Sequence, residues 1–322
     1  MCKEGNLNTL YTTQISDHWQ QGTFSSFEGV DLVDIHYCSF VFPQHSRSII
    51  IVPGRSEGYL KYKELTYDLH LAGYNVFIID HRGQGLSGRM LEDKLKGYVQ
   101  HFDDYVLDLH YFIENIVQPK IEHSPYLLAH SMGGAISTRF LQSHENSIKA
   151  AVLASPMIEI NSGAMPKWFV SILMKIALKF FKHESYFFGQ SGKHSFKYKD
   201  NRLTHSNVRY KIFAQLYEQT PTLKLGGATI QWLKSAIDVG QDIIRDVKKL
   251  NTPTMVLQAC GDKVVDNNAQ NRFCELLNSV NKSSCPGGKP FRIETAKHEL
   301  FFESDEYRDK ALTQAVNWFE QH

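Results

Sequence analysis

Residues 127–137, LLAHSMGGAIS, hold a serine that could act as a nucleophile. Ser131 follows an apolar run and precedes a stretch with helical spacing, and its neighbours two positions away, Ala129 and Gly133, are small. A tight strand-to-helix turn needs small residues there, because it lifts the serine hydroxyl into a strained, exposed position. The string also fits an ordinary serine in a small-residue loop, so the rest of the chain must supply a base, an acid and an oxyanion hole.

Acidic residues and a histidine follow later apolar runs in the order serine, acid, histidine, which is the order found in folds with such a serine turn. Asp262 and Asp266 come directly after one run, and His298 comes after the last one. If these runs are parallel strands, both loops open at the carboxyl edge of the sheet, where Ser131 would emerge. The sequence therefore predicts that the three groups meet.

The sequence leaves two assignments open, the identity of the acid and the role of His298. Asp262 lies nearer the end of its strand than Asp266 and is the preferred acid. The other carboxylate is expected to cap the helix that begins near Asn267. For His298, the alternative is a solvated histidine near a helix start, although its place after the last strand favours catalysis.

The oxyanion hole requires two backbone N–H groups. Met132, at the start of the helix after Ser131, is one predicted donor. The segment 49–59, IIIVPGRSEGY, provides the other, because Gly54 lets the backbone turn inward and directs the Arg55 N–H toward the serine. The Arg55 side chain could also meet an anionic group, although a solvated arginine fits equally well.

Two competing motifs are unsupported. GQGLSG (83–88) matches the spacing of a dinucleotide-binding loop, but no clear helix begins there. The HEL at 298 lacks the second histidine of a zinc helix, and no other His/Cys cluster has metal-ligand spacing. We expect no cofactor, no metal and no nucleic-acid partner.

The elements that must position these groups alternate between strands and helices. Short, continuous apolar runs are typical of strands covered on both faces, and helical patterns lie between them. This alternation predicts an α/β fold with a mostly parallel sheet and helices on both faces. The expected strands are 47–54, 74–80, 124–130, 150–156, 252–260 and a shorter one at 291–296. The expected helices are 59–72, 102–116, 134–144, 267–278 and 305–321.

The alternation breaks between about 160 and 235. This region has no obvious buried strand, and we expect a helical cap inserted between the fourth and fifth runs, leaving 1–159 and 236–322 as the core. It carries twelve Lys/Arg against three Asp/Glu, about +9, so the remainder carries about −8. Local charge of this size bears on what the segment meets, not on its fold.

The composition indicates the class of protein and the cellular compartment. Hydrophobic residues make up 42% and charged residues 21% of the 322 residues, which is ordinary for a globular protein with a sizeable core. The N-terminal stretch has no signal-peptide pattern, and no run reaches the roughly 18 apolar residues of a spanning helix. Five cysteines without CxxC spacing predict free thiols in a reducing compartment. We therefore expect a cytoplasmic protein.

Residues 165–182 combine a large aromatic and aliphatic surface with Lys175, Lys179 and Lys182 on one helical face. A basic stripe beside such a surface favours reversible contact with anionic membrane lipids, possible without any spanning helix. The alternative is a helix that roofs the active site and whose lysines are merely solvated. The two interpretations are compatible.

The chain resembles the serine α/β-hydrolases, in the branch of lysophospholipase L2 and the monoacylglycerol lipases. Within that branch it is most similar to the bacterial lysophospholipases of the L2 type. The segments that carry the resemblance cover roughly 50–320. They are VPGRSEGYLKYKELTYDLHLAGYNVFIIDHRGQGLSGR, LLAHSMGGAI, LQACGDKVVDN and KHELFFESD.

The resemblance implies an eight-stranded α/β-hydrolase core with a helical cap and no cofactor. It implies Ser131 as nucleophile, His298 as base, Asp262 in preference to Asp266 as acid, and the Arg55 and Met132 amides as oxyanion donors. Two departures are visible. Pro53-Gly54 stands where monoacylglycerol lipases usually have His-Gly, which weakens that assignment, and Ala129 replaces the first glycine of the serine turn.

The expected function is a lysophospholipase that cleaves the single acyl ester of a lysophospholipid, with acyl transfer to a lipid alcohol left open. A monoacylglycerol lipase or general carboxylesterase is the enzymatic alternative. The non-enzymatic alternative is a hydrolase-fold protein that only binds lipid or a partner, against which the ordered serine, acid and histidine argue.

Overall fold

One mixed sheet of eight strands forms the centre of the molecule. The computed structural model describes residues 1–322 except 164, 166, 193–197, 199 and 200. The strand order is β1-β2-β4-β3-β5-β6-β7-β8; β1 and β2 run antiparallel to their neighbours and the rest are parallel. The strands are β1 (Thr23–Glu28), β2 (Asp34–Phe40), β3 (Arg47–Val52), β4 (Tyr74–Ile79), β5 (Tyr126–His130), β6 (Ala151–Ala154), β7 (Thr254–Ala259) and β8 (Phe291–Ile293).

The six predicted runs form β3 to β8, which confirms the mostly parallel α/β sheet. Five of them, β3 to β7, are buried along nearly their whole length, because helices cover both faces. The sequence patterns did not predict β1 and β2. Five of the six residues of β1 are exposed, so this edge strand has no apolar run.

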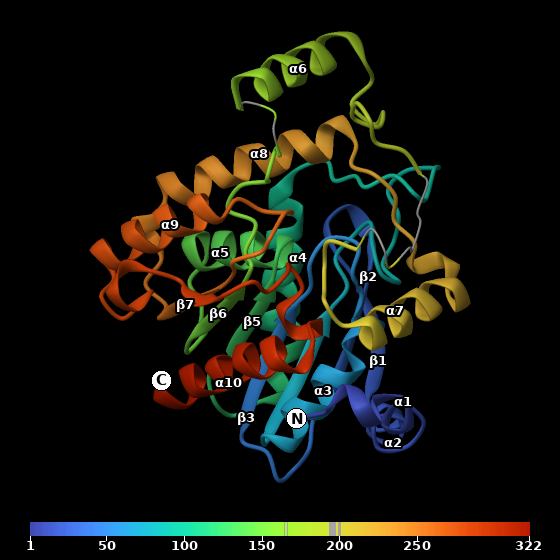
Figure 1. The fold of residues 1–322 in the computed structure, drawn as a ribbon, viewed down its shortest axis with the longest axis vertical. Helices are drawn as coiled ribbons and strands as arrows, with labels where there is room; N and C mark the ends of the chain where they lie inside the picture. Colours follow the sequence, from blue (N-terminus) through green and yellow to red (C-terminus); the bar gives the residue numbers. More distant parts are fainter. Residues whose placement is uncertain (164, 166, 193–197, 199–200) are drawn as a thin grey trace.

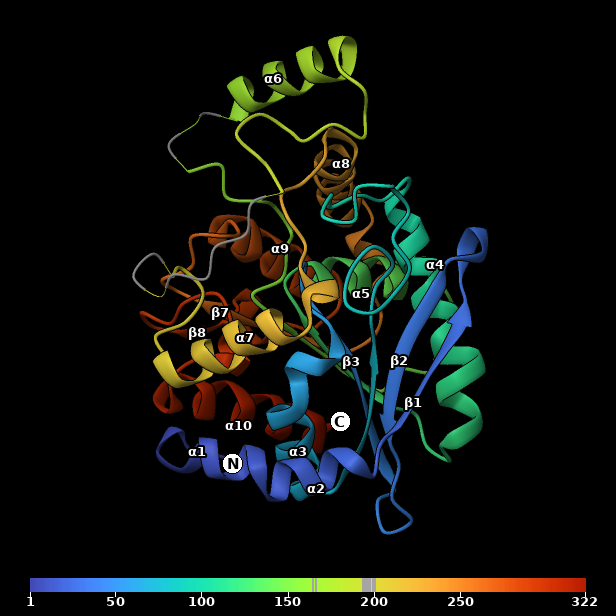
Figure 2. The same ribbon diagram turned by 90° about the vertical axis from the view of Figure 1, so that its right-hand side faces the viewer.

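Helices pack on both faces of the sheet and enclose two hydrophobic clusters (Figures 1 and 2). One face carries α4, α5, α8 and α9, and the other carries α3 and α10. The helices are α1 (Leu7–Thr12), α2 (Gln14–Gln20), α3 (Lys63–Leu71), α4 (Phe102–Phe112), α5 (Met132–Ser143), α6 (Lys167–Phe180), α7 (Asn207–Gln219), α8 (Ile230–Arg245), α9 (Asn267–Val280) and α10 (Asp305–Gln321).

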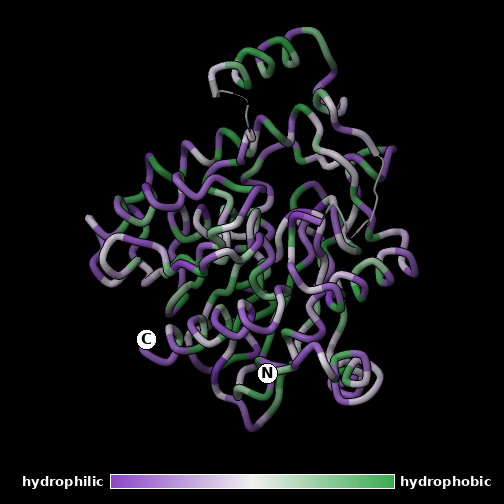
Figure 3. The backbone as a smooth tube through the Cα atoms, viewed as in Figure 1, coloured by the Kyte–Doolittle hydropathy of each residue, from purple (hydrophilic) through white to green (hydrophobic). Residues whose placement is uncertain are grey.

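The chain between β6 and β7 contains α6, α7 and α8. Residue 235, where the sequence placed the end of the cap, lies inside α8, whose apolar side packs on the core. Helix α6 lies beyond α8, on the side away from the sheet (Figure 1). Figure 3 shows many hydrophobic residues along α6, as in the sheet.

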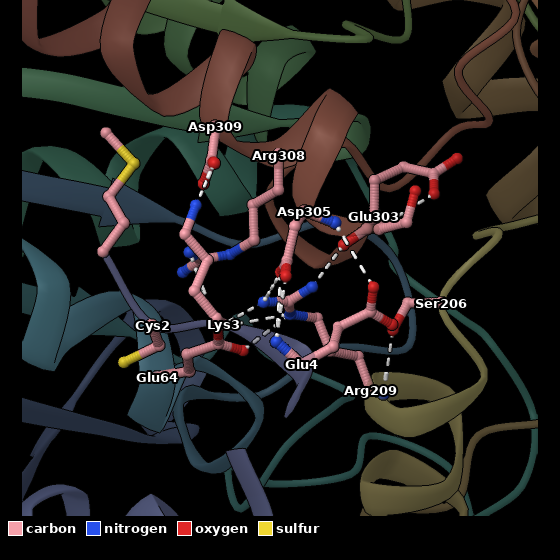
Figure 4. A network of polar contacts seen from close by, with 12 residues as sticks. Cys2, Lys3, Glu4, Glu64, Ser206, Arg209, Glu303, Asp305, Arg308 and Asp309 are labelled. Carbon is pink, nitrogen blue, oxygen red and sulfur yellow. Dashed lines mark hydrogen bonds and ion pairs between the residues drawn. The ribbon is translucent and has the colours of Figure 1, made fainter. Parts of the chain in front are cut away.

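A polar network fastens α7 to the core (Figure 4). Arg209 of α7 donates to Glu64 of α3 and to Asp305 at the start of α10. Ser206, the N-cap of α7, donates to Glu4 at 2.5 Å. Arg308 of α10 pairs with Asp68 of α3 at 2.7 Å. Four segments that are distant in the sequence therefore meet at this point.

All five cysteines are free thiols in the part of the chain that is described. Among the same residues, no helix is long and apolar enough to span a bilayer.

Candidate active site

Ser131 lies on a strained turn between β5 and α5. Its φ of 52° and ψ of −116° are unusual for a residue with a side chain. The turn requires glycine at 133, because a Cβ there would lie 2.1 Å from the carbonyl oxygen of Val52. This close approach to β3 is the physical reason for the small residue after the serine.

The structure brings Ser131, His298 and Asp262 into one hydrogen-bonded chain. The Ser131 Oγ lies 2.9 Å from His298 Nε2, and His298 Nδ1 lies 2.6 Å from Asp262 Oδ2. All three come from the carboxyl edge of the sheet, after β5, β8 and β7. Ser131 and His298 are buried, with 7% and 4% of their surface exposed.

The environment of Asp262 favours its ionised form. Its Oδ1 accepts hydrogen bonds from the backbone N–H groups of Val264 at 2.7 Å and Val265 at 3.3 Å. Burial alone raises the pKa of this carboxyl, but His298 and the two N–H groups lower it below its ordinary value. Asp266, the alternative acid, is the N-cap of α9 and accepts from the Asn268 N–H at 2.8 Å.

The oxyanion donors expected from the sequence lie beside this serine. Met132 is the first residue of α5, and Arg55 follows Gly54 in the loop after β3. A Cβ on Gly54 would lie 3.2 Å from the Ser131 Cβ, so this loop packs directly against the serine turn. Neither the Arg55 nor the Met132 backbone N–H has a hydrogen-bond acceptor among the described residues.

A buried charged cluster, which we call the Glu57 cluster, lies behind the site and was not predicted. Glu57 accepts hydrogen bonds from the Gly54 N–H at 2.5 Å and from Lys61 at 2.6 Å. Lys61 also donates to Glu299, the residue after His298, at 2.6 Å. The cluster thus joins the loop after β3 that carries Arg55, the candidate oxyanion loop, to the loop after β8 that carries His298, the histidine loop.

His130, the residue before the serine, extends this cluster. Its Nδ1 lies 3.1 Å from Glu57 Oε2, and its Nε2 lies 3.2 Å from the carbonyl oxygen of His298. Burial alone would lower its pKa, but the Glu57 carboxylate raises it above the ordinary value. Burial likewise opposes ionisation of Glu57, yet Lys61 and His130 hold its pKa well below the usual range.

Glu303 fixes the other side of the histidine loop. Its Oε1 accepts from the Lys297 N–H at 2.8 Å, and its Oε2 accepts from the His205 N–H at 2.7 Å. The side chain is fully buried. One carboxylate therefore holds both the residue before His298 and the start of α7.

Two cavities lie on the α6 side of the site. The larger, of about 930 Å³, is lined by α6, α8 and the segment after β6, with side chains that include Met174, Leu178 and Ile237. The smaller, of about 430 Å³, is lined by Asp262 and shares Asn161, Ser162 and Met165 with the larger one. The larger cavity is mostly apolar, whereas the smaller one, which reaches Asp262, is lined mainly by polar residues such as Asn161 and Asp266.

One group of potential metal ligands occurs among the described residues, at Cys2, Glu64 and Asp68. Its chemistry does not suit a cation, because Arg209 and Arg308 already neutralise the two carboxylates. Burial and these carboxylates raise the pKa of the Cys2 thiol to about 12. A thiol in that state is a poor metal ligand.

Comparison with known proteins identifies the family. A protein-family profile described as "Serine aminopeptidase, S33", of the Hydrolase_4 group, matches residues 43–305. The chain belongs to this family of α/β-hydrolases. The match spans the loop after β3, the turn at Ser131, both candidate acids and His298. This family member is a serine ester hydrolase.

The proteins that the chain resembles include two lysophospholipases. Lysophospholipase L2 of Escherichia coli K12 is 40% identical over 309 residues, which cover 96% of this chain and 90% of that protein. A probable lysophospholipase L2 of Haemophilus influenzae is 30% identical and covers 99% and 98% of the two chains. A crystal structure of a soluble variant of monoglyceride lipase from Saccharomyces cerevisiae, in complex with a substrate analogue, superposes with a TM-score of 0.69. It is 18% identical, over 93% of this chain and 97% of that one, and shows the shared fold.

Proposed function

We propose that this hydrolase cleaves the acyl ester of lysophospholipids, releasing a fatty acid and the glycerophospho-headgroup. The observation that carries the proposal is the hydrogen-bonded chain from Ser131 through His298 to Asp262. The similarity to two lysophospholipases over nearly the whole chain supports the choice of substrate class.

The proposed mechanism uses His298 as the base. Its Nε2 takes the Ser131 proton while the Oγ attacks the ester carbonyl, and Asp262 keeps the proton of the imidazole on Nδ1. The Arg55 and Met132 amides stabilise the negative charge on the former carbonyl oxygen. His298 then protonates the leaving glycerol oxygen, and water attacks the acyl-enzyme. A lipid alcohol in place of that water would give acyl transfer.

The cavity beneath α6 suits the acyl chain. A single fatty acyl chain needs an apolar enclosure, and α6 and α8 line that cavity with methionine, leucine and isoleucine side chains. In this arrangement α6 is the roof of the acyl site.

A substrate panel tests the proposal. Lysophosphatidylethanolamine and monoacylglycerol with the same acyl chain should both be assayed, and we expect higher kcat/KM for the lysophospholipid. Each reaction should be analysed for fatty acid and for acylated lipid alcohol. Preference for neutral monoacylglycerol would favour the lipase alternative, and no hydrolysis of any ester would contradict an enzymatic role.

We also propose that α6 contacts an anionic membrane surface. Its outer side exposes Trp168 and Phe180, which are 65% and 69% accessible, although the helix buries Met174 and Ala177 against α8. Lys175 and Lys179 of α6 are exposed, and so is Lys182, two residues beyond the end of the helix. An apolar face bordered by lysines is typical of helices that lie in the membrane interface.

Replacing Lys175, Lys179 and Lys182 together by alanine should weaken binding to vesicles of anionic phospholipid by about 100-fold at low ionic strength, since each lysine near such a surface contributes about 1 kcal/mol. Vesicle co-sedimentation measures this. Binding of the unchanged protein should fall at high salt. The matched control replaces Lys248, Lys282 and Lys289, which are exposed elsewhere. Salt-independent binding, or equal losses in both variants, would count against α6 as the contact.

A further inference from the structure

Two partly buried arginines, Arg55 in the loop beside the serine turn and Arg89, have no carboxylate within ion-pair distance among the described residues. Arg55 donates to the carbonyl oxygen of Gly226 at 2.7 Å, and Arg89 donates to that of Thr222 at 2.7 Å. The fully buried arginines pair with acids instead. They are Arg82 with Asp108, Arg209 with Glu64, and Arg308 with Asp68.

The guanidinium of Arg55 is the less satisfied of the two. Of its five N–H donors, one meets Gly226 and one lies 3.3 Å from the Ser56 hydroxyl. Its Nε is buried without a hydrogen-bond partner among the described residues. Burial lowers the pKa of this group to about 10, so it remains a cation at neutral pH. A cation held in this way lacks the counter-charge that normally offsets its desolvation.

The position of Arg55 relates this unsatisfied charge to the reaction. Its backbone N–H is the candidate oxyanion donor, so its side chain begins at the point where the ester carbonyl would bind. The guanidinium lies 4.9 Å from the ring of Trp232 on α8. Glycine at position 97 makes room for it, because a Cβ there would lie 2.2 Å from Nη2.

We propose that the Arg55 side chain binds the phosphate group of the substrate and thereby selects lysophospholipids over neutral monoacylglycerols. This inference rests on the proposed function. In a lysophospholipid the glycerol unit separates the ester carbonyl from the phosphate, a span comparable with an arginine side chain. A phosphate offers the guanidinium several acceptor oxygens and a full counter-charge. A monoacylglycerol offers neither.

The test compares substrate selectivity in three variants. Lysophosphatidylethanolamine and monoacylglycerol of equal, short acyl length should be assayed below aggregation, which removes membrane effects. In Arg55→Gln, the ratio of the two kcat/KM values should fall about 10- to 100-fold, the usual effect of a hydrogen bond to a charged group. Arg55→Lys should restore part of the ratio. Arg89→Gln, which also loses contacts to the loop before α8, should keep the ratio within about twofold.

Each outcome has a distinct meaning. Equal losses for both substrates in Arg55→Gln, or an equally large fall of the ratio in Arg89→Gln, would show that the arginine only supports the loop and would overturn the inference. Hydrolysis of monoacylglycerol but not lysophospholipid by the unchanged protein would instead reject the proposed function. Inorganic phosphate provides a third comparison. Inorganic phosphate could change the rates for both substrates equally, and only when Arg55 is present. If Arg55→Gln also leaves the ratio of the two kcat/KM values constant, Arg55 binds free phosphate and its assignment to the headgroup is wrong.

Discussion

Replacing Ser131 by alanine is expected to lower ester hydrolysis on the order of 10⁶-fold and to abolish labelling by a fluorophosphonate probe. The variant removes only the oxygen that lies 2.9 Å from His298 Nε2. The backbone stays in the same strained conformation, because alanine has the same Cβ as serine. We therefore expect the unfolding temperature to stay close to that of the unchanged protein, as measured by circular dichroism.

Ser137 provides the matched control for this prediction. It lies on α5, is fully buried, and its hydroxyl has no hydrogen-bond partner among the described residues. Ser137→Ala should keep activity and labelling, because removing an unpaired buried hydroxyl costs little. Persistent labelling in Ser131→Ala would move the nucleophile to another residue.

Replacing Asp262 by asparagine is expected to lower kcat about 10⁴-fold, the loss seen when a catalytic histidine is held in the wrong tautomer. The Val264 and Val265 N–H groups require an acceptor at Oδ1. The amide oxygen of asparagine would occupy that position, so its NH₂ would face His298 Nδ1. The imidazole would then carry its proton on Nε2 and could not accept one from Ser131.

Asp266→Asn is the control for the acid. Asp266 caps α9, and asparagine is an equally good N-cap. Steady-state kinetics should therefore show a change in kcat of less than about threefold. A larger loss in Asp266→Asn than in Asp262→Asn would reverse the assignment of the acid.

Much of the site was predictable because parallel strands impose a simple geometry. The apolar runs that became β5, β7 and β8 end at the same edge of the sheet, so the polar residues after them had to converge. Distance along the chain from the end of β7 was enough to prefer Asp262, and Asp266 caps α9 as the alternative required. Glycine at 133 follows from the close approach of β3.

The Glu57 cluster was not predictable, because its members resemble ordinary surface charges in the sequence. Glu57 and Lys61 have the spacing of an exposed helical ion pair. Nothing local indicates that both are buried or that Lys61 meets Glu299, far along the chain. The strand β1 was not predicted because its exposed residues lack a hydrophobic pattern. The Glu57 cluster depends on contacts between distant segments, whereas β1 pairs with β2, the next strand along the chain.

The Glu303 carboxylate has a consequence for the order in which the protein forms. Ser131 and the oxyanion loop leave the ribosome well before residues 298 and 303 are made. Glu303 then joins the residue before His298 to the start of α7, and α7 in turn needs Glu4 and Glu64. Contacts this distant in the sequence form late in folding. An incomplete nascent chain therefore has the serine without its histidine, and we expect ester hydrolysis only when synthesis and folding are finished.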